Sequence, residues 1–338
     1  MIKQNKKVLV IRCGLLGDTV DATSVIEPLI EMYGDNVEIH WVSKPGISNL
    51  FKYDTRIRKV FKLRHTKLLF LFNIEKLKII LHSLYEPYDL ILNLEIGSKF
   101  NDIVRYSKSI KKIGMPYSYI ADDIFKEHRV NHQLRILDSL SPTYIKQKAI
   151  PSIVGVDINS VKNKYPINEP YIVLCPTNSH VGNANHRGYR SWPEKNWKDL
   201  IEMILEETSL NILLVGSKDE KQYFKIFYPL QQRDYDISGM TDVPELITIM
   251  QESKCVVATD SGSAHVAGAV AKNIVSIHGP TNSYQSAPYS TSKNNIRVAS
   301  LNLECSPCYD TDIIKKCKKN ICMHDLNAKA IFSLIQDF

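Results

Sequence analysis

The sequence predicts an α/β protein built from two doubly wound domains. Apolar strand-like runs alternate with helical stretches in the first half, and the same alternation starts again after residue 170. Between the two series, residues 141–170 are rich in Pro, Asn, Ser and Lys. Alternating strands and helices form parallel sheets covered on both faces, and a polar break is typical of an interdomain connection. The predicted domains comprise residues 1–160 and 168–338.

The first domain is expected to contain three strands and two helices. The strands are predicted at 8–12, 37–43 and 89–94, and the helices at 19–33 and 72–85. The segment 67–87 is the most apolar of the chain, although Glu75, Lys76 and Lys78 interrupt it. It is predicted to be a helix that faces the core, with a helix lying on a membrane surface as the alternative.

The second domain repeats the pattern. Its strands are predicted at 171–176, 211–217, 256–260 and 274–280, and its helices after the SWPEKNW motif, near 219–230 and from Ser261. Trp192 and Trp197 are expected to pack in the core at the start of their helix. The last helix of the chain belongs to this domain, with packing back on the first domain as an alternative.

Composition limits the class of protein. The chain has 338 residues, 44% of them hydrophobic and 23% charged, and no run approaches the roughly 18 apolar residues of a membrane span. The N-terminus lacks the features of a signal peptide, so a cytoplasmic location is expected. A net charge of +7, with basic runs at 56–67 and 105–112, favours an acidic glycolipid or anionic membrane surface over nucleic acid. A solvated basic face without a partner is the alternative.

Four of the seven cysteines lie close together in the sequence. Cys305, Cys308, Cys317 and Cys322 have the spacing C-x2-C-x8-C-x4-C. Thiolates at such spacing hold zinc or iron in structural sites, which predicts a bound structural metal with His324 as a substitute ligand. Free thiols in a packed loop are the alternative, and disulfides of a secreted domain are disfavoured.

The first motif, RCGLLGDT, follows the first predicted strand. Gly14 and Gly17 would let the turn run close to a ligand, and Asp18 either caps the following helix or acts as a base over a cleft. A dinucleotide-binding dehydrogenase is disfavoured, because the full G-x-G-x-x-G is missing. The next strand also ends in Ser43 and Lys44 where a ribose-binding carboxylate is expected.

The second motif, TDSGSAH, lies where a strand ends in Asp260 and a helix begins. Ligands of doubly wound sheets bind beyond the carboxyl ends of the strands, where helix N-termini present free N–H groups. The N–H groups of Ser261, Gly262 and Ser263 therefore predict a diphosphate site, and His265 in the first turn is expected to face the same crevice.

Together with RSWPEKNW, VGSKDE, IHGPTN and CSPC, these motifs resemble, in the same order, those of glycosyltransferase family 9, the heptosyltransferases of lipopolysaccharide assembly. The resemblance covers nearly the whole chain and is weakest from 50 to 150. It implies a GT-B fold of two facing Rossmann-like domains, with ADP-heptose in the C-terminal domain and the acceptor against the N-terminal one. It also implies inverting transfer that requires no metal.

The resemblance extends to single residues. Asp18 matches the catalytic aspartate of the family, Arg190 the basic residue that meets the diphosphate, and Glu220 the acidic residue after the VGS strand. Asp260, Ser261, Gly262 and His265 match the donor loop. Ser24 replaces the usual proline, and the loop 178–189 is longer than expected, which leaves donor contacts from Thr177 open.

The predicted function is transfer of heptose or a related sugar from a nucleotide-sugar donor to a lipopolysaccharide or lipooligosaccharide core, or a similar bacterial glycan. Such chemistry needs a base for the acceptor hydroxyl and cationic or N–H groups for the departing diphosphate. The enzyme would work at the inner face of the cytoplasmic membrane on a lipid-linked acceptor. The alternatives are another GT-B enzyme such as a nucleotide-sugar epimerase, and a non-catalytic nucleotide-sugar-binding protein.

Overall fold

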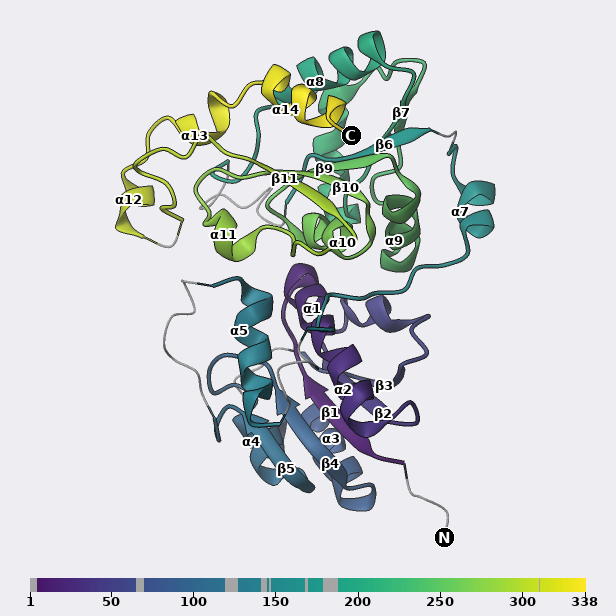
Figure 1. Cartoon of the computed structure of the whole chain (residues 1–338), viewed down its shortest axis with the longest axis vertical. Helices are drawn as coiled ribbons and strands as arrows, with labels where there is room; N and C mark the ends of the chain where they lie inside the picture. Colours follow the sequence, from purple (N-terminus) through teal and green to yellow (C-terminus); the bar gives the residue numbers. More distant parts are fainter. Residues whose placement is uncertain are drawn as a thin grey trace. The chain divides into compact units, whose positions relative to one another are not determined.

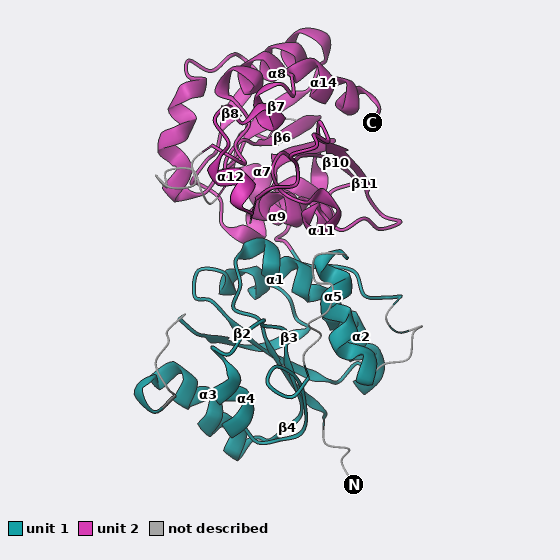
Figure 2. Ribbon diagram, turned by 90° about the vertical axis from the view of Figure 1, so that its left-hand side faces the viewer, with its two compact units in different colours: residues 1–154 teal, residues 155–338 magenta. Residues whose placement is uncertain are grey.

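The computed structural model of the chain comprises two compact units, residues 1–154 and 155–338 (Figures 1 and 2). It describes residues 5–64, 70–118, 127–140, 145, 147–167, 170–178, 188–309 and 311–338. Each unit is built on one parallel sheet with helices on both faces. No helix of these described segments is both long enough and apolar enough to cross a bilayer.

The first unit contains a five-stranded parallel sheet in the order β3-β2-β1-β4-β5. Its strands are β1 (Lys7–Ile11), β2 (Glu38–Ser43), β3 (Ile57–Lys62), β4 (Tyr88–Asn93) and β5 (Ser109–Gly114). In the centre, Val8 of β1 pairs with Ile39 of β2 and Leu90 of β4. The middle of the sheet is buried and apolar, as expected for a parallel sheet covered on both faces.

Helices cover both faces of this sheet. They are α1 (Leu16–Ala22), α2 (Ile26–Tyr33), α3 (Ile74–Tyr85), α4 (Asn101–Tyr106) and α5 (Arg129–Arg135), with the 3-10 helices η1 (Thr23–Val25), η2 (Ser48–Phe51), η3 (Phe70–Phe72) and η4 (Ile136–Ser139). Helices α3 and α4 lie side by side on one face, and α1, α2 and α5 lie on the other (Figure 2). The helix predicted over 19–33 is thus two helices joined by a 3-10 turn.

The two basic runs of the first half form the edge strands of this sheet. Strand β3 lies within the run 56–67, and β5 overlaps the run 105–112. An edge strand has one side open to water, and lysines there discourage pairing with another chain. The sequence analysis predicted charged surface at these runs but no strands, because they lack the apolar pattern of the central strands.

The second unit contains a six-stranded parallel sheet in the order β11-β10-β9-β6-β7-β8. Its strands are β6 (Tyr171–Cys175), β7 (Asn211–Leu214), β8 (Asp234–Asp236), β9 (Cys255–Thr259), β10 (Asn273–Ile277) and β11 (Asn295–Ala299). Its helices are α7 (Ile158–Lys164), α8 (Glu194–Glu207), α9 (Val243–Glu252), α10 (Gly262–Val270), α11 (Ser283–Ser286), α12 (Asp312–Lys315), α13 (Ile321–His324) and α14 (Ala328–Gln336). The helix predicted near 219–230 is a 3-10 helix, η5 (Lys218–Phe227).

The core of the second unit forms around the start of α8. Trp192 and Trp197 are almost fully buried, and their ring centroids lie 4.9 Å apart, which confirms their predicted core position. The indole of Trp192 donates a 2.7 Å hydrogen bond to the carbonyl of Leu326, which precedes α14. The apolar face of α14, with Ile331 and Phe332, belongs to the same core, so the last helix of the chain is packed within the second unit.

In each sheet the strand order reverses once. In the first unit this happens between β1 and β4, and in the second between β6 and β9. The connections that leave two such strands run in opposite directions, which opens a crevice at the carboxyl ends where ligands of this architecture bind. The residues directly after these four strands are therefore the candidate functional residues.

Candidate active site

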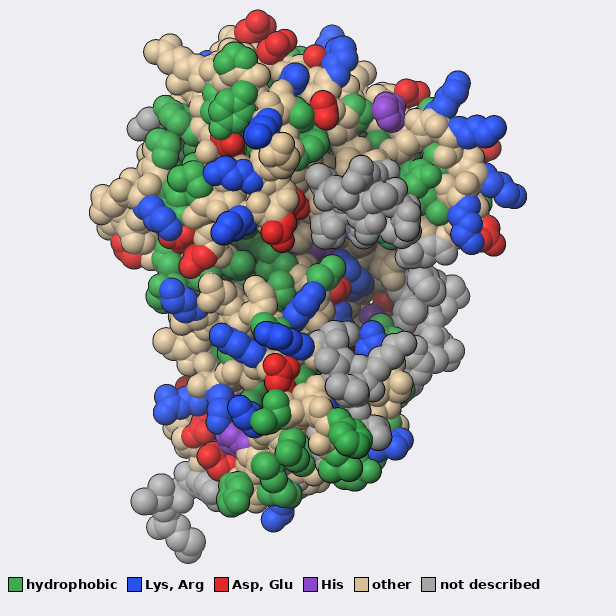
Figure 3. Space-filling view, turned by 180° about the vertical axis from the view of Figure 1, so that it is seen from behind, with side chains coloured by type: hydrophobic (Ala, Val, Ile, Leu, Met, Phe, Trp, Pro, Cys, Tyr) green, Lys and Arg blue, Asp and Glu red, His purple; other side chains and the backbone are tan. Residues whose placement is uncertain are grey.

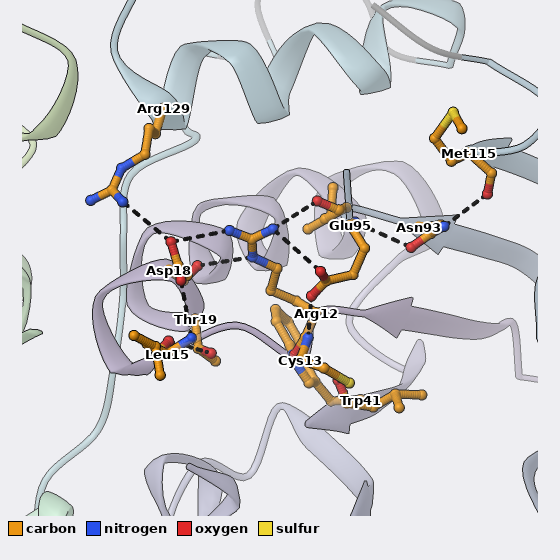
Figure 4. Close-up of polar contacts among 12 residues, drawn as sticks. Arg12, Cys13, Leu15, Asp18, Thr19, Trp41, Asn93, Glu95, Met115 and Arg129 are labelled. Atoms are coloured by element: carbon orange, nitrogen blue, oxygen red, sulfur yellow. Dashed lines mark hydrogen bonds and ion pairs between the residues drawn. The ribbon is translucent and has the colours of Figure 1, made fainter. Parts of the chain in front are cut away.

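Asp18 is the third residue of α1, just beyond the carboxyl end of β1. Its Oδ2 accepts a 3.0 Å hydrogen bond from the backbone N–H of Leu15, the N-cap residue, so the side chain caps the start of the helix as in a capping box. Its Oδ1 lies 3.3 Å from Nη2 of Arg12 and 3.2 Å from Nη1 of Arg129 (Figure 4). The carboxylate of Asp18 is therefore held from three directions while its side chain stays 26% exposed.

Arg12 ties this carboxylate to the reversal point of the sheet. Its side chain is largely buried, and its Nη1 donates a 3.0 Å hydrogen bond to the carbonyl of Leu94, which follows β4. The next residue, Glu95, accepts a hydrogen bond from the backbone N–H of Cys13. Contacts between the ends of β1 and β4 thus position the arginine that holds Asp18.

Gly14 is required at its position because of Asp18. A Cβ on Gly14 would lie 2.5 Å from Cβ and 2.8 Å from Oδ2 of Asp18, well inside ordinary contact. Gly17 is the second residue of α1 and is buried. The close approach at Gly14 is to the aspartate of the same turn, whereas the approach to a ligand predicted from the two glycines stays a prediction.

In the second unit, the residues after β6 and β9 meet at the other reversal point. Thr177 is buried, and its carbonyl accepts a 3.5 Å hydrogen bond from the hydroxyl of Thr259. The next residue, Asp260, is buried and forms an ion pair with Arg190, with Oδ2 and Nη1 3.2 Å apart. The structure thus brings together three of the predicted donor-site residues, Thr177, Arg190 and Asp260.

The ionisation of Asp260 is set by its neighbours. Burial alone would raise the pKa of its carboxyl. The charges of His278, Arg190 and His265, together with a hydrogen bond from Thr281, outweigh burial and hold the pKa below its usual value. Asp260 is therefore a buried carboxylate that stays ionised because of the groups around it.

Helix α10 begins directly after Asp260. Ser261 is its N-cap, and the hydroxyl of Ser261 is buried without a hydrogen-bond partner among the described residues. Gly262 is the first helical residue, and the first N–H groups of a helix have no partner within the helix. His265 is buried one turn into the helix, close enough for its charge to act on Asp260. These residues have the arrangement predicted for a diphosphate site.

Glu220 lies at the start of η5, after β7. One of its carboxylate oxygens, Oε2, accepts a 2.7 Å hydrogen bond from the backbone N–H of Ser217. Glu220 thus has a structural role at this turn, and its side chain is half-buried. Most of the long loop 178–189, with its predicted effect on donor contacts, lies outside the described residues.

The model of glycosyltransferase family 9 (heptosyltransferase) matches residues 80–318, well over half of the chain. The protein belongs to glycosyltransferase family 9. It is 23% identical over 316 residues to lipopolysaccharide heptosyltransferase 1 of Campylobacter coli, covering 86% of this chain and 88% of that protein. Lipooligosaccharide heptosyltransferase 2 of Haemophilus influenzae is 27% identical over 133 residues, which span 38% of this chain and only 37% of that relative.

Solved structures agree on the fold. The ADP-heptose LPS heptosyltransferase II of Escherichia coli superposes with a TM-score of 0.77 at 18% identity, covering 98% of each chain. The E. coli heptosyltransferase WaaC with ADP gives a TM-score of 0.70 at 15% identity, covering 98% of this chain and 99% of that one. This family 9 glycosyltransferase therefore has the GT-B fold predicted from its sequence.

The cysteine-bearing segment of the glycosyltransferase, residues 305–309 and 311–324, supports the turn after β10. The backbone N–H groups of Cys308 and Tyr309 both donate to the carbonyl of Pro280, at 2.8 and 2.9 Å. A Cβ on Gly279 would lie 2.4 Å from Sδ of Met323, so this turn packs directly against the segment. The ring of Tyr309 in turn lies 5.0 Å below the guanidinium of Arg190.

The four cysteines of the predicted metal site are neighbours, but they do not form a ready metal site. Cys305 is exposed, Cys317 is half-buried, and Cys308 and Cys322 are buried. Burial, with smaller contributions from the other three thiols, raises the pKa of Cys322 to about 11. Within the described part of the chain, no three His, Cys, Asp or Glu side chains are placed to share a metal ion.

Sequence reasoning missed several residues of the two crevices. Arg12, Glu95 and His278 each come within two residues of a strand end, so the rule of carboxyl ends could have found them. Neither Arg129 nor Tyr309 lies close after a strand, so this rule does not indicate them. Arg129 contacts Asp18 across 111 positions of sequence, and only the tertiary fold brings the two together.

Proposed function

We propose that this glycosyltransferase transfers a heptose from ADP-heptose to a lipopolysaccharide or lipooligosaccharide core, or to a similar bacterial glycan. The family, the names of its relatives and the ADP bound to a structural neighbour support this choice of donor and acceptor. The observation that carries the proposal is the meeting of Arg190, Asp260 and the N-terminus of α10 at the reversal point of the second sheet.

The donor site would hold the diphosphate through positive groups and free N–H groups. Arg190 supplies a guanidinium, and the first turn of α10 supplies backbone N–H groups and the positive end of its dipole. The buried hydroxyl of Ser261 can donate to a phosphate oxygen. The carboxylate of Glu220 would instead accept hydrogen bonds from hydroxyl groups of the nucleotide sugar. Thr177 and His265 complete the proposed set.

The acceptor side would use Asp18 as a general base. The acceptor hydroxyl loses its proton to the carboxylate of Asp18 while its oxygen bonds to the anomeric carbon of the donor sugar. The bond from that carbon to the diphosphate oxygen breaks, and the nucleoside diphosphate leaves with the electron pair. Inversion follows from attack opposite the leaving group, and no step requires a metal ion.

The variant Asp18→Asn tests this role. The amide keeps a hydrogen-bond acceptor of nearly the same shape but cannot take a proton, so sugar transfer should fall about 10²- to 10⁴-fold while ADP binding is unchanged. Asp21→Asn is the matched control, because Asp21 lies in the same helix and also contacts Arg129, at 3.5 Å. A transfer rate near that of the wild type in Asp18→Asn would show that Asp18 is only a helix cap.

Calorimetric titration with ADP tests the donor site separately. The wild type should bind ADP, and Asp260→Ala combined with His265→Ala should abolish or strongly weaken binding. Asp219→Ala, an exposed carboxylate at the start of η5, serves as the control. Unchanged ADP binding in the double variant would contradict the proposed donor site. Conversion of a nucleotide sugar in the absence of any acceptor would instead support the epimerase alternative.

We also propose, as a separate matter, that the four-cysteine cluster binds a structural zinc or iron ion. Thiolates are suitable ligands for either metal, but the described side chains would have to rearrange to share one ion. Metal analysis of protein purified without an affinity metal column should find about one ion per chain, and Cys308→Ser should lose it. Metal-free protein with full activity would support the alternative of packed free thiols.

A further inference from the structure

Helix α3 carries apolar residues on two opposite faces. Its inner face packs on the sheet of the first unit through Ile79 and Ile80, which are at most 5% exposed. Ile79 shares a core cluster with Leu9 of β1 and Ile91 of β4. This face attaches the helix to the core of its unit.

The outer face is also apolar, and it is exposed. Ile74, Leu81 and Tyr85 follow one another at intervals of seven and four residues, so they lie on the same side of the helix. They are 68%, 43% and 86% exposed. Leu84 flanks this row, and the preceding turn η3 extends it with Leu71 and Phe72, which are 66% and 74% exposed. These six residues are called the α3 patch below.

The α3 patch is one continuous apolar area, unlike the single exposed apolar residues that are normal on protein surfaces. Hydrophobic side chains gather in one area over the part of the first unit that contains α3 (Figure 3). A helix that only covers a sheet has polar residues on its solvent side, and a contiguous exposed apolar patch marks an interaction site. The patch therefore requires an explanation beyond the fold of the unit.

Several basic residues lie on α3 or next to it. Lys78 lies within the exposed row, one turn after Ile74. Contacts with residues of α3 bring four further exposed basic residues near the helix. The backbone of Arg64 and Lys99 bonds to side chains of its first turn, the backbone of Lys108 bonds to Ser83, and Lys59 covers the ring of Phe61, which contacts His82. Of the nearby carboxylates, Asp102 is bound by Lys76 at 2.8 Å and Glu86 by Lys7, whereas Glu75 accepts a hydrogen bond from the backbone N–H of Arg64. The surroundings of the patch thus carry net positive charge.

We propose that the α3 patch docks on a lipid bilayer that contains anionic lipids. A helix of 12 residues is about 18 Å long and can lie flat in the interfacial region with its apolar row buried among the acyl chains. Phe72 and Tyr85 stand near its two ends, and aromatic rings favour this interface. Lys78 can extend its amine from an apolar stem toward the phosphates. The charge of the rim favours an anionic membrane over a neutral surface.

Vesicle binding tests this proposal without donor or acceptor, so its outcome is independent of the proposed transfer activity. The full-length protein should co-sediment with vesicles of phosphatidylcholine and phosphatidylglycerol at low salt, and far less with pure phosphatidylcholine. Ile74→Ser, Leu81→Ser and Tyr85→Ser combined should weaken binding at least tenfold. Since these side chains are exposed, the thermal midpoint should not change. Val298→Ser with Ile313→Ser, exposed in the second unit, should bind like the wild type.

The charge component has its own variant. Lys59→Gln with Lys78→Gln should weaken binding to anionic vesicles by about fivefold per lysine, whereas Lys198→Gln with Lys254→Gln in the second unit should not. The proposal is wrong if the wild type does not bind anionic vesicles, or if the α3 variants bind as well as their controls. A concentration-dependent dimer that only the wild-type patch forms, without vesicle binding, would assign the patch to a second copy of the chain instead.

Discussion

The replacement of Gly14 by Ala should disable the enzyme through Asp18. The new Cβ would lie 2.5 Å from Cβ of Asp18, whereas ordinary contacts begin at about 3.4 Å, so the two groups must separate by about 0.9 Å. The backbone of Gly14 does not have a positive φ, so alanine adds no conformational strain of its own. The clash with Asp18 is therefore the whole effect of the substitution.

Two magnitudes follow from this displacement. Overpacking of this kind lowers the free energy of unfolding by about 1 to 3 kcal/mol, which corresponds to a fall of roughly 3 to 10 °C in the melting temperature of a unit of this size. A misplacement of about 1 Å in a reacting group can lower the rate on the order of a hundredfold. Catalysis should therefore suffer far more than folding.

The assay is sugar transfer from ADP-heptose, measured beside thermal unfolding and ADP titration. Gly14→Ala should transfer sugar about a hundred times more slowly and bind ADP normally, because the donor residues belong to the second unit. Gly46→Ala is the matched control in the same unit, since its Cβ would meet no atom within 4 Å. Turnover within twofold of the wild type in Gly14→Ala would refute the assignment of Asp18 as a positioned base.

Three further outcomes are expected. Arg190→Lys keeps the charge but loses the planar fork and its ring contact, so the Kd for ADP should rise about tenfold by calorimetry. Gly114→Ala should lower the free energy of unfolding by more than about 3 kcal/mol, because the φ of Gly114 is +83° and the new Cβ would lie 1.9 Å from the carbonyl oxygen of Asn93. Gly97→Ala is the control with the smaller effect, because Gly97 has an unfavourable φ but no atom near its Cβ position. Burial and the neighbouring His82 lower the pKa of His40 to about 4. Between pH 6.5 and 4 the unfolded chain thus binds more protons than the folded chain, so the free energy of unfolding should be about 2 kcal/mol lower at pH 5 than above pH 6.5. Thermal melts at pH 5 and above pH 6.5 should show that His40→Gln removes this difference.

The sequence predicted the buried strands better than the edge strands. Strands β1, β4, β6 and β9 were found because their side chains face the core on both sides and form unbroken apolar runs. At β3 and β5 the sequence predicts only charged surface, because each strand is partly exposed and lacks an unbroken apolar run. The short strand β8, with three residues, has too little pattern to be seen.

The same limit applies to the candidate site. Asp18, Asp260 and Arg190 stand in local motifs, so their positions could be predicted from neighbouring residues. The partners that hold them come from distant segments: Arg129 reaches Asp18 from α5, and His278 reaches Asp260 from the end of β10. Such contacts depend on the order of strands in the sheets, which the residue pattern alone does not specify.

The packing of the turn after β10 restricts how this region can change during evolution. Gly279 has no room for a side chain because Met323 and Cys322 fill the space beside it, and Pro280 accepts two hydrogen bonds from the same cysteine-bearing segment. A larger residue at position 279 would need a smaller one at position 323 to be tolerated. Among related proteins, these two positions should therefore vary together, and exchanging the cysteine-bearing segment between relatives should succeed only when the turn is exchanged with it.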